Sequence, residues 1–235
     1  GSGTQKVEQE LAALFPGTKV LRMDADTVAA ARGHEALLKQ FTEQNIPILL
    51  GTQMVAKGLD FENVTLVGVL DADLSLYVQN YHAAERTYSL LAQVVGRAGR
   101  GERAGRAVIQ TYHPENEVIQ AAAKQDYEAF YQSELRLRRL RRYPPFADLF
   151  TLTVSGSEEL RVIAAARTLC DALRCESERE PLRALETEVL GPAGAPVVKV
   201  NDRYRYCVYL CGRSDSALRR TVSEYLLAFY ARKEN

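Results

Sequence analysis

Short apolar runs alternate with stretches of helical periodicity through the first half of the 235-residue sequence. The run VTLVGVLDAD (64–73) is apolar almost throughout, which is typical of a strand covered on both faces in a parallel sheet. Similar runs at 18–24, 46–51 and 106–112 predict the other strands, and amphipathic helical patterns lie between them. This order predicts an α/β fold in which helices flank a parallel sheet.

Two long helices are expected within and after this region. Residues 25–44 form one periodic pattern that begins near Asp24, a residue type that caps helix N-termini. A polar, aromatic pattern over 115–142 predicts a second long helix, which ends at the sequence YPPF (143–146). Two consecutive prolines break helical hydrogen bonding, so they mark a domain boundary.

Beyond the prolines the predicted order is β-α-β-β-α. A strand at 147–156 and a helix at 157–174 come before a strand followed by a turn at 188–196, a hairpin at 197–212 and a closing helix at 214–233. This order is typical of a small α+β domain. The predicted parts are an α/β domain over 1–116, a helical linker with a basic cluster over 117–145, and the α+β domain over 146–235.

The composition fits a soluble globular protein, since 46% of the residues are hydrophobic and 26% are charged. Thirty basic and thirty acidic residues cancel, so any nucleic-acid-binding surface must be a local patch. No apolar run approaches the ~18 residues of a membrane span, and no segment resembles a signal peptide. We therefore expect a cytoplasmic protein without a membrane partner.

The cysteines and histidines predict no metal site. The four cysteines do not form C-x-x-C pairs, and Cys207 and Cys211 would stand about 13 Å apart on one face of a strand. One metal ion cannot bridge that gap, so we interpret them as small apolar core residues. His34, His82 and His113 are too scattered along the sequence to suggest a metal or a catalytic base.

A glycine-rich stretch with four arginines, QVVGRAGRGERAGR (93–106), is the first candidate site. Arginine offers a planar fork of donors that suits phosphate, and glycine lets the backbone approach a ligand. If the stretch is helical, Arg97 and Arg100 are i, i+3 neighbours that can reach the same anion. The alternative is a basic turn between a helix and a strand.

The second candidate is GTQMVAKGLDF (51–61), which follows a predicted strand. Gly51 and Thr52 can offer an N–H and a hydroxyl to phosphate, and Asp60 can accept from a ribose hydroxyl. The alternative is an ordinary loop from strand to helix. Because ligands gather at the carboxyl ends of parallel strands, we expect this loop, the DAD at 71–73 and the arginine stretch to form one site there.

In this order the two stretches resemble motifs V and VI of superfamily 2 helicases. Four passages of the chain resemble sequences of the PriA family of replication-restart helicases. They occur in the same order and span nearly the whole chain: GTQMVAKGLDFENVTLVGVLDAD, LLAQVVGRAGR, YPPFADL and DRYRY. The resemblance implies that 1–116 is a RecA-like second helicase lobe. It implies that 146–235 is the family's C-terminal domain.

The resemblance also implies roles for single residues. In motif VI, Arg100 would be the arginine finger on the γ-phosphate of ATP, with Arg97 and Gln93 beside it. The nucleotide-binding residues carried over are Gly58, Asp60 and Gly96. The residues carried over as contacts to the DNA backbone are Gly51, Thr52 and Gln53.

The chain lacks two motifs that a helicase needs. Neither a G-x-x-x-x-G-K-[ST] phosphate loop nor a D-E-x-x motif for Mg²⁺ occurs in it. The resemblance implies that a first lobe with both motifs and a zinc module precede this segment, and that relatives continue into one more strand. We therefore expect a C-terminal fragment that has no zinc ligands and is inactive alone, from a protein that uses ATP, Mg²⁺ and zinc.

Two basic clusters are further DNA-binding candidates. Arg138, Arg139 and Arg142 lie in LRLRRLRR (135–142) and can track phosphates. The alternative is a solvated helix face whose arginines pair with Glu128 and Glu134.

The other cluster is RYRY (203–206), in which Arg203 and Arg205 alternate with two tyrosines. Cations beside stacking rings can bind DNA or a protein tail. Alternatively, Tyr204 and Tyr206 share one face of a strand and belong to the core.

The resemblance implies that the parent is an ATP-dependent 3′-to-5′ DNA helicase, which remodels stalled forks and initiates primosome assembly in replication restart. Its implied partners are branched and single-stranded DNA, single-stranded DNA-binding protein and other primosome proteins. The alternative function is a non-enzymatic module, derived from a helicase lobe, that binds nucleic acid or protein. The intact G-R-x-G-R favours the helicase, because an adaptor does not need it.

Overall fold

The computed structural model describes residues 3–30, 33–56, 64–78, 80–96, 105–180, 182–213 and 215–231. The chain divides into two compact units, Gly1–Phe130 and Tyr131–Asn235, and each is considered by itself. The three domain ranges expected from the sequence stay a prediction. No described helix is both long enough and apolar enough to cross a membrane.

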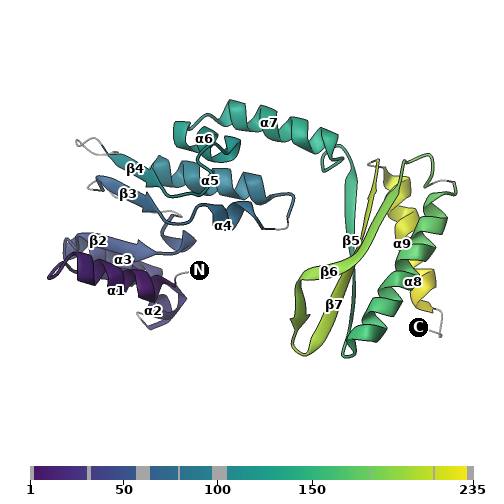
Figure 1. The fold of residues 1–235 in the computed structure, drawn as a ribbon, viewed down its shortest axis with the longest axis horizontal. Helices are drawn as coiled ribbons and strands as arrows, with labels where there is room; N and C mark the ends of the chain where they lie inside the picture. The colour runs from purple at the N-terminus through teal and green to yellow at the C-terminus, as the bar shows by residue number, and fades with distance from the viewer. Residues whose placement is uncertain are drawn as a thin grey trace. The chain divides into compact units, whose positions relative to one another are not determined.

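The first unit confirms the predicted α/β alternation (Figure 1). Its elements, in chain order, are α1 (Thr4–Leu14), β1 (Val20–Met23), α2 (Ala25–Ala30), α3 (His34–Glu43), β2 (Ile48–Gly51), the 3₁₀ helix η1 (Gln53–Ala56), β3 (Leu66–Val69), α4 (Asp73–Leu76), α5 (Ala83–Val95), β4 (Arg106–Ile109) and α6 (Glu117–Lys124). In the described part of the chain, β1 pairs with β2 and β3 pairs with β4, both in parallel. The parallel strands therefore form two two-stranded sheets.

Both long helices expected from the sequence are broken in two. The pattern over 25–44 divides into α2 and α3 at Gly33, whose φ of 135° lies outside the helical region. The pattern over 115–142 divides into α6 and α7 (Tyr127–Leu140) at Gln125, which adopts a left-handed conformation with a φ of 55°. Apolar residues occur on both sides of each break, so the composition of each segment predicted a single helix.

The sheet formed by β3 and β4 is covered on one face by described helices. Val69 and Ile109 point into a cluster built on Tyr88 and Leu91 of α5 and on α6. Alternate residues on the other face stay open, and Leu66 is 62% exposed. The expectation that this strand is covered on both faces is therefore wrong for the described residues.

Asp24 follows β1 and caps the N-terminus of α2, and its carboxylate accepts several hydrogen bonds. Its carboxylate accepts from the Thr4 hydroxyl at 2.6 Å and from the backbone N–H of Thr27 at 3.0 Å. The Arg22 guanidinium lies 3.0 Å from the same carboxylate. The Thr4 hydrogen bond, followed by the Thr27 N–H, lowers the pKa of Asp24 from an ordinary 3.8 to about 2.

Because the pKa of Asp24 is lowered in the folded state, the free energy of unfolding depends on pH in the acidic range. The contribution of the Asp24 carboxylate is complete above pH 3.8 and is lost as pH falls toward 2. Urea unfolding of the chain and of Asp24→Asn should therefore show a gap in midpoint that closes between these two pH values. Asp26→Asn, an exposed change in the same helix, is the control for removing one charge. A gap that stays constant down to pH 2 would contradict the role of Asp24.

The second unit is an antiparallel sheet with helices on one face, which confirms the α+β prediction (Figure 1). After the end of α7, its elements are β5 (Asp148–Gly156), α8 (Glu159–Ser177), β6 (Glu188–Val200), β7 (Arg203–Gly212) and α9 (Ser216–Ala231). The strand order is β5-β7-β6. Val208 and Leu210 of β7 pack against Leu173 of α8 and Leu218 of α9 in the core.

The structure confirms the predicted hairpin and the interpretation of Cys207 and Cys211 as core residues. The turn predicted within 188–196 is wrong. Residues 188–200 form the single strand β6, which passes through the expected turn with register shifts between Leu190 and Ala193 and between Gly194 and Lys199. Such irregularities let a strand continue past prolines. Cys207 and Cys211 are free and buried, as expected of small core residues.

Candidate functional site

The motif V stretch begins at the carboxyl end of β2. Gly51 pairs with Met23, and a Cβ added to Gly51 would stand 2.6 Å from the Met23 carbonyl oxygen and would overlap the Val55 side chain. A glycine is therefore required by packing. Thr52 and Gln53 follow as exposed residues, and η1 packs against α5.

The motif VI stretch begins on α5. Thr87 and Leu91 are on the buried face of this helix, whereas Gln93 is exposed near its end. Gly96 caps the helix, and its N–H donates to the carbonyl of Ala92 at 2.9 Å. Arg97, Arg100, Gly58 and Asp60 lie outside the described residues.

The described residues that flank the two stretches meet at one edge of a sheet. Thr65 lies just before β3 and four residues after the motif V stretch, and Arg106, the last residue of the arginine stretch, begins β4. The backbone N–H of Arg106 donates to the Thr65 carbonyl at 2.8 Å. The last residue of the arginine stretch and the residue that precedes β3 are therefore hydrogen-bonded neighbours at the amino ends of β3 and β4.

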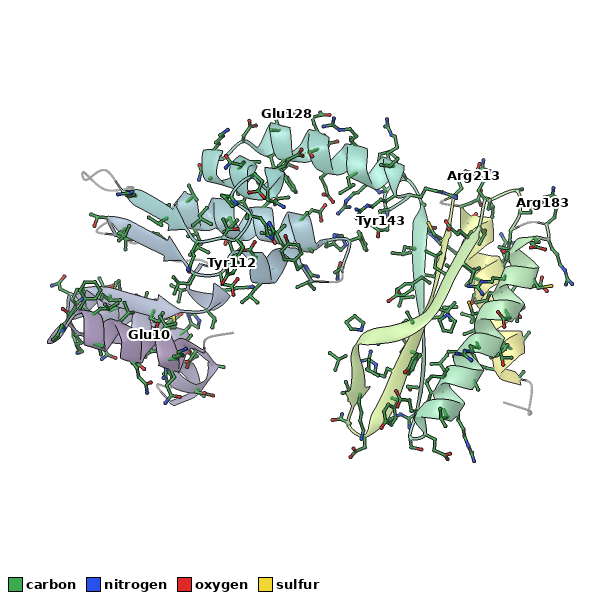
Figure 2. The ribbon with its side chains drawn as sticks, viewed as in Figure 1. Glu10, Tyr112, Glu128, Tyr143, Arg183 and Arg213 are labelled. Carbon is green, nitrogen blue, oxygen red and sulfur yellow. The ribbon has the colours of Figure 1, made fainter. Side chains whose placement is uncertain are left out.

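This edge is not the one expected. The arginine stretch connects α5 to the amino end of β4, so the prediction that it emerges with DAD at the carboxyl ends is wrong. At the carboxyl ends, buried Asp73 accepts from the Thr111 hydroxyl at 3.0 Å and from the Tyr112 N–H at 2.9 Å. Figure 2 shows Tyr112 beyond the end of β4. Asp73 thus ties two strand ends together, a role that the sequence did not indicate.

The arginines at the end of α7 have different environments. Arg138 is buried, with its Nε 2.7 Å from Glu134 and its Nη1 3.0 Å from the carbonyl oxygen of Pro144. This is the ion pair of the alternative interpretation, and it occupies the guanidinium. Arg138 is therefore unsuited to track phosphates.

Two other members of this cluster also have partners in the second unit. The Nη2 of Arg142 donates to the carbonyl oxygen of Glu186 at 2.7 Å, and the Arg142 carbonyl accepts from the Cys211 thiol at 3.1 Å. Burial raises the pKa of the Cys211 thiol, which keeps the thiol protonated. Arg139 is exposed and lies 4.9 Å from the ring centre of Phe146. Its guanidinium stays accessible.

The RYRY residues divide between the two faces of β7. The Tyr206 hydroxyl donates to Glu159 of α8 at 2.9 Å, and this hydrogen bond raises the pKa of Tyr206. Arg203 and Arg205 alternate with the tyrosines and so lie on the opposite face. Arg203 is exposed, and its Nη2 donates to the Ser155 carbonyl at 3.0 Å. Tyr206 is thus a packing residue, and the basic face remains a binding candidate.

The described residues of the motif V stretch present donors that suit an anion. The exposed side chains of Thr52 and Gln53, next to a tightly packed Gly51, suit phosphate. In the described part of the chain, no group of three or more His, Cys, Asp or Glu side chains could hold a metal ion. The described residues therefore fit a phosphate ligand and do not form a Mg²⁺ or zinc site.

Two family models match the chain. Residues 2–102 match the helicase conserved C-terminal domain, and residues 139–235 match the primosomal protein N C-terminal domain. Replication restart protein PriA of Bacillus subtilis (strain 168) is 45% identical over 228 residues, which are 96% of this chain and 28% of that protein. The chain belongs to the PriA family.

Other PriA proteins are similar to the chain over most of its length. That of Synechocystis is 42% identical over 209 residues, which are 88% of this chain and 24% of the relative. That of Rickettsia conorii is 34% identical over 226 residues, which are 96% of this chain and 34% of the relative. The chain thus corresponds to part of a PriA replication restart protein, and it spans no more than about a third of these relatives.

Proposed function

We propose that this chain forms the second helicase lobe and the C-terminal domain of an ATP-dependent 3′-to-5′ DNA helicase that acts in the cytoplasm. The observation that carries the proposal is the 2.8 Å hydrogen bond between Arg106 and Thr65, two residues that follow motif VI and motif V in the chain. If the nucleotide site and the DNA contact lie at one edge of a lobe, a shift of that lobe on ATP hydrolysis also shifts the bound DNA. This coupling is what a helicase needs.

In this proposal Arg100 and Arg97 face the γ-phosphate of ATP, which another lobe of the same protein holds. ATP supplies the phosphoryl group whose transfer to water drives movement along DNA. The guanidinium of Arg100 neutralises the charge that develops on the phosphate oxygens in the transition state. Gln93, exposed near the end of α5, lies four residues before Arg97 in the sequence and belongs to the same motif in this proposal.

The DNA-binding residues of the proposal, taken in each unit by itself, are fewer than those predicted from sequence. Exposed Thr52 and Gln53 contact the backbone near motif V, and Arg139, Arg203 and Arg205 supply cations. The ion pair of Arg138 and the Glu186 contact of Arg142 assign these two residues to structure instead. Single-stranded and branched DNA are the proposed substrates.

The proposed cellular role is the remodelling of stalled forks and the start of primosome assembly. Single-stranded DNA-binding protein and other primosome proteins are the proposed partners. Mg²⁺ and zinc are proposed to bind to parts of the full-length protein other than this chain.

The purified 235-residue chain should bind single-stranded DNA in a salt-sensitive manner without hydrolysing ATP. Each phosphate contact contributes about 0.7 to the slope of log affinity against log salt. Arg203→Ala with Arg205→Ala should therefore reduce the slope by about 1.4, measured by fluorescence anisotropy. Arg161→Ala, which removes a guanidinium that is 81% exposed, is the matched control. ATP hydrolysis by the chain alone, or an unchanged slope in the double variant, would contradict the proposal.

A further inference from the structure

Gln125 occupies the corner between α6 and α7. Its left-handed backbone places its N–H 3.1 Å from the Ala122 carbonyl, and the next N–H, from Asp126, donates to Ala121 at 2.9 Å. Ala121 and Ala122 are buried in the cluster that packs α6 against α5. The backbone of the corner is therefore fixed relative to α5.

The side chain of Gln125 reaches the last turn of α5. Its Nε2 donates to the Ala92 carbonyl at 3.1 Å, across 33 residues of sequence. The same carbonyl accepts from the N–H of Gly96 at 2.9 Å. Carbonyls at a helix C-terminus have few helical donors, and a side-chain amide from another helix can hold such a turn in place. Gln125 thus clamps the turn from which the arginine stretch departs.

Gly96 is required by this contact. A Cβ at Gly96 would stand 2.8 Å from the Nε2 of Gln125 and 3.1 Å from the Ala92 carbonyl oxygen. The φ of Gly96 is −67°, which any residue adopts, so the need is for space and not for backbone freedom. The glycine of the G-R-x-G-R pattern therefore makes room for Gln125, and Arg97 is the next residue in the chain.

We propose that Gln125 is a positioning residue that holds the start of the arginine stretch for ATP hydrolysis. This inference rests on the proposed function of Arg97 and Arg100. Gln125 does not touch the nucleotide in this proposal. It fixes the last turn of α5, because a small displacement of a transition-state group lowers the rate far more than it lowers binding.

The test uses the full-length protein that contains this chain, with Gln125→Ala compared with Gln120→Ala. Gln120 is a matched control, because its Nε2 also donates to a backbone carbonyl, that of Pro114, at 2.6 Å. Loss of one hydrogen bond of typical strength should raise amide exchange in the last turn of α5 about fivefold. The kcat for DNA-stimulated ATP hydrolysis should fall at least about fivefold with an unchanged Kd for DNA. Gln120→Ala should change neither quantity.

A double-mutant cycle tests whether Gly96 acts through Gln125. Gly96→Ala should reduce kcat as Gln125→Ala does, because the new methyl group displaces the amide. The double variant should lose no more than either single variant, since neighbours that act through one contact are not additive. Full additivity would show that the two positions act separately and would overturn the inference.

The exchange measurement separates this inference from the proposed function. If Gln125→Ala changes neither amide exchange nor kcat while Arg100→Ala abolishes turnover, the clamp is wrong and the proposed function stands. If the unaltered full-length protein shows no turnover, the proposed function is wrong. If turnover survives Arg100→Ala, the assignment of Arg100 is wrong, and the positioning role of Gln125 is overturned with it. Faster exchange with unchanged kcat would likewise overturn the positioning role.

Discussion

Replacing Arg100 with alanine in the full-length protein should reduce DNA-stimulated ATP turnover by roughly 10³- to 10⁵-fold. The reason is that a guanidinium on the γ-phosphate stabilises charge that exists only in the transition state. The Kd for single-stranded DNA without nucleotide should stay unchanged, because the lost interaction is with ATP. Initial rates of phosphate release at saturating DNA measure the effect.

Arg136→Ala is the matched control for this experiment. It removes an exposed arginine from α7 and should leave turnover unchanged. Turnover that survives Arg100→Ala would remove the assignment of Arg100. Absence of turnover in the unaltered full-length protein would instead favour the non-enzymatic binding module.

Replacing Arg138 with alanine should lower the free energy of unfolding by about 3 kcal/mol, near the low end for removing one partner of a buried ion pair. The change leaves the Glu134 carboxylate, only 11% exposed, without its nearest cation. It also removes a donor from the Pro144 carbonyl, at the corner where Figure 2 shows Tyr143 after α7. Urea denaturation of the chain measures the loss.

Two further variants separate structure from DNA binding. Arg138→Lys keeps the charge but cannot reach both Glu134 and Pro144 with a planar fork, so it should recover only part of the stability. Arg136→Ala should change stability by no more than about 0.5 kcal/mol. If Arg138→Ala instead weakened DNA binding at full stability, Arg138 would return to the DNA-binding set.

Much of the fold could be predicted from the sequence, because the strands are short apolar runs separated by amphipathic segments. What periodicity could not predict was the break in each long helix. Both breaks occur at one residue with a positive φ, Gly33 or Gln125, within a segment that has apolar residues on both sides of it. At Gln125 the tertiary contact to α5, which no local pattern encodes, accompanies the break.

The arginine stretch was predicted at the wrong end of the strands. The sequence order of helix, arginine stretch and strand already indicates a connection that enters a strand at its amino end. The general rule for ligands at carboxyl ends therefore did not apply to this stretch. The burial of Arg138 could not be predicted from the sequence. Arg136, Arg138 and Arg139 are the same residue type and differ only in the residues that pack against them.

The central claim is that the stretches around Arg100 and Asp60 form one side of an ATP site. A structure of the full-length protein with a non-hydrolysable ATP analogue and DNA tests it most directly. Guanidinium nitrogens of Arg97 and Arg100 should lie about 3 Å from oxygens of the γ-phosphate, with the residues around Asp60 in the same site. A triphosphate bound without contact to residues 97–100 would contradict it.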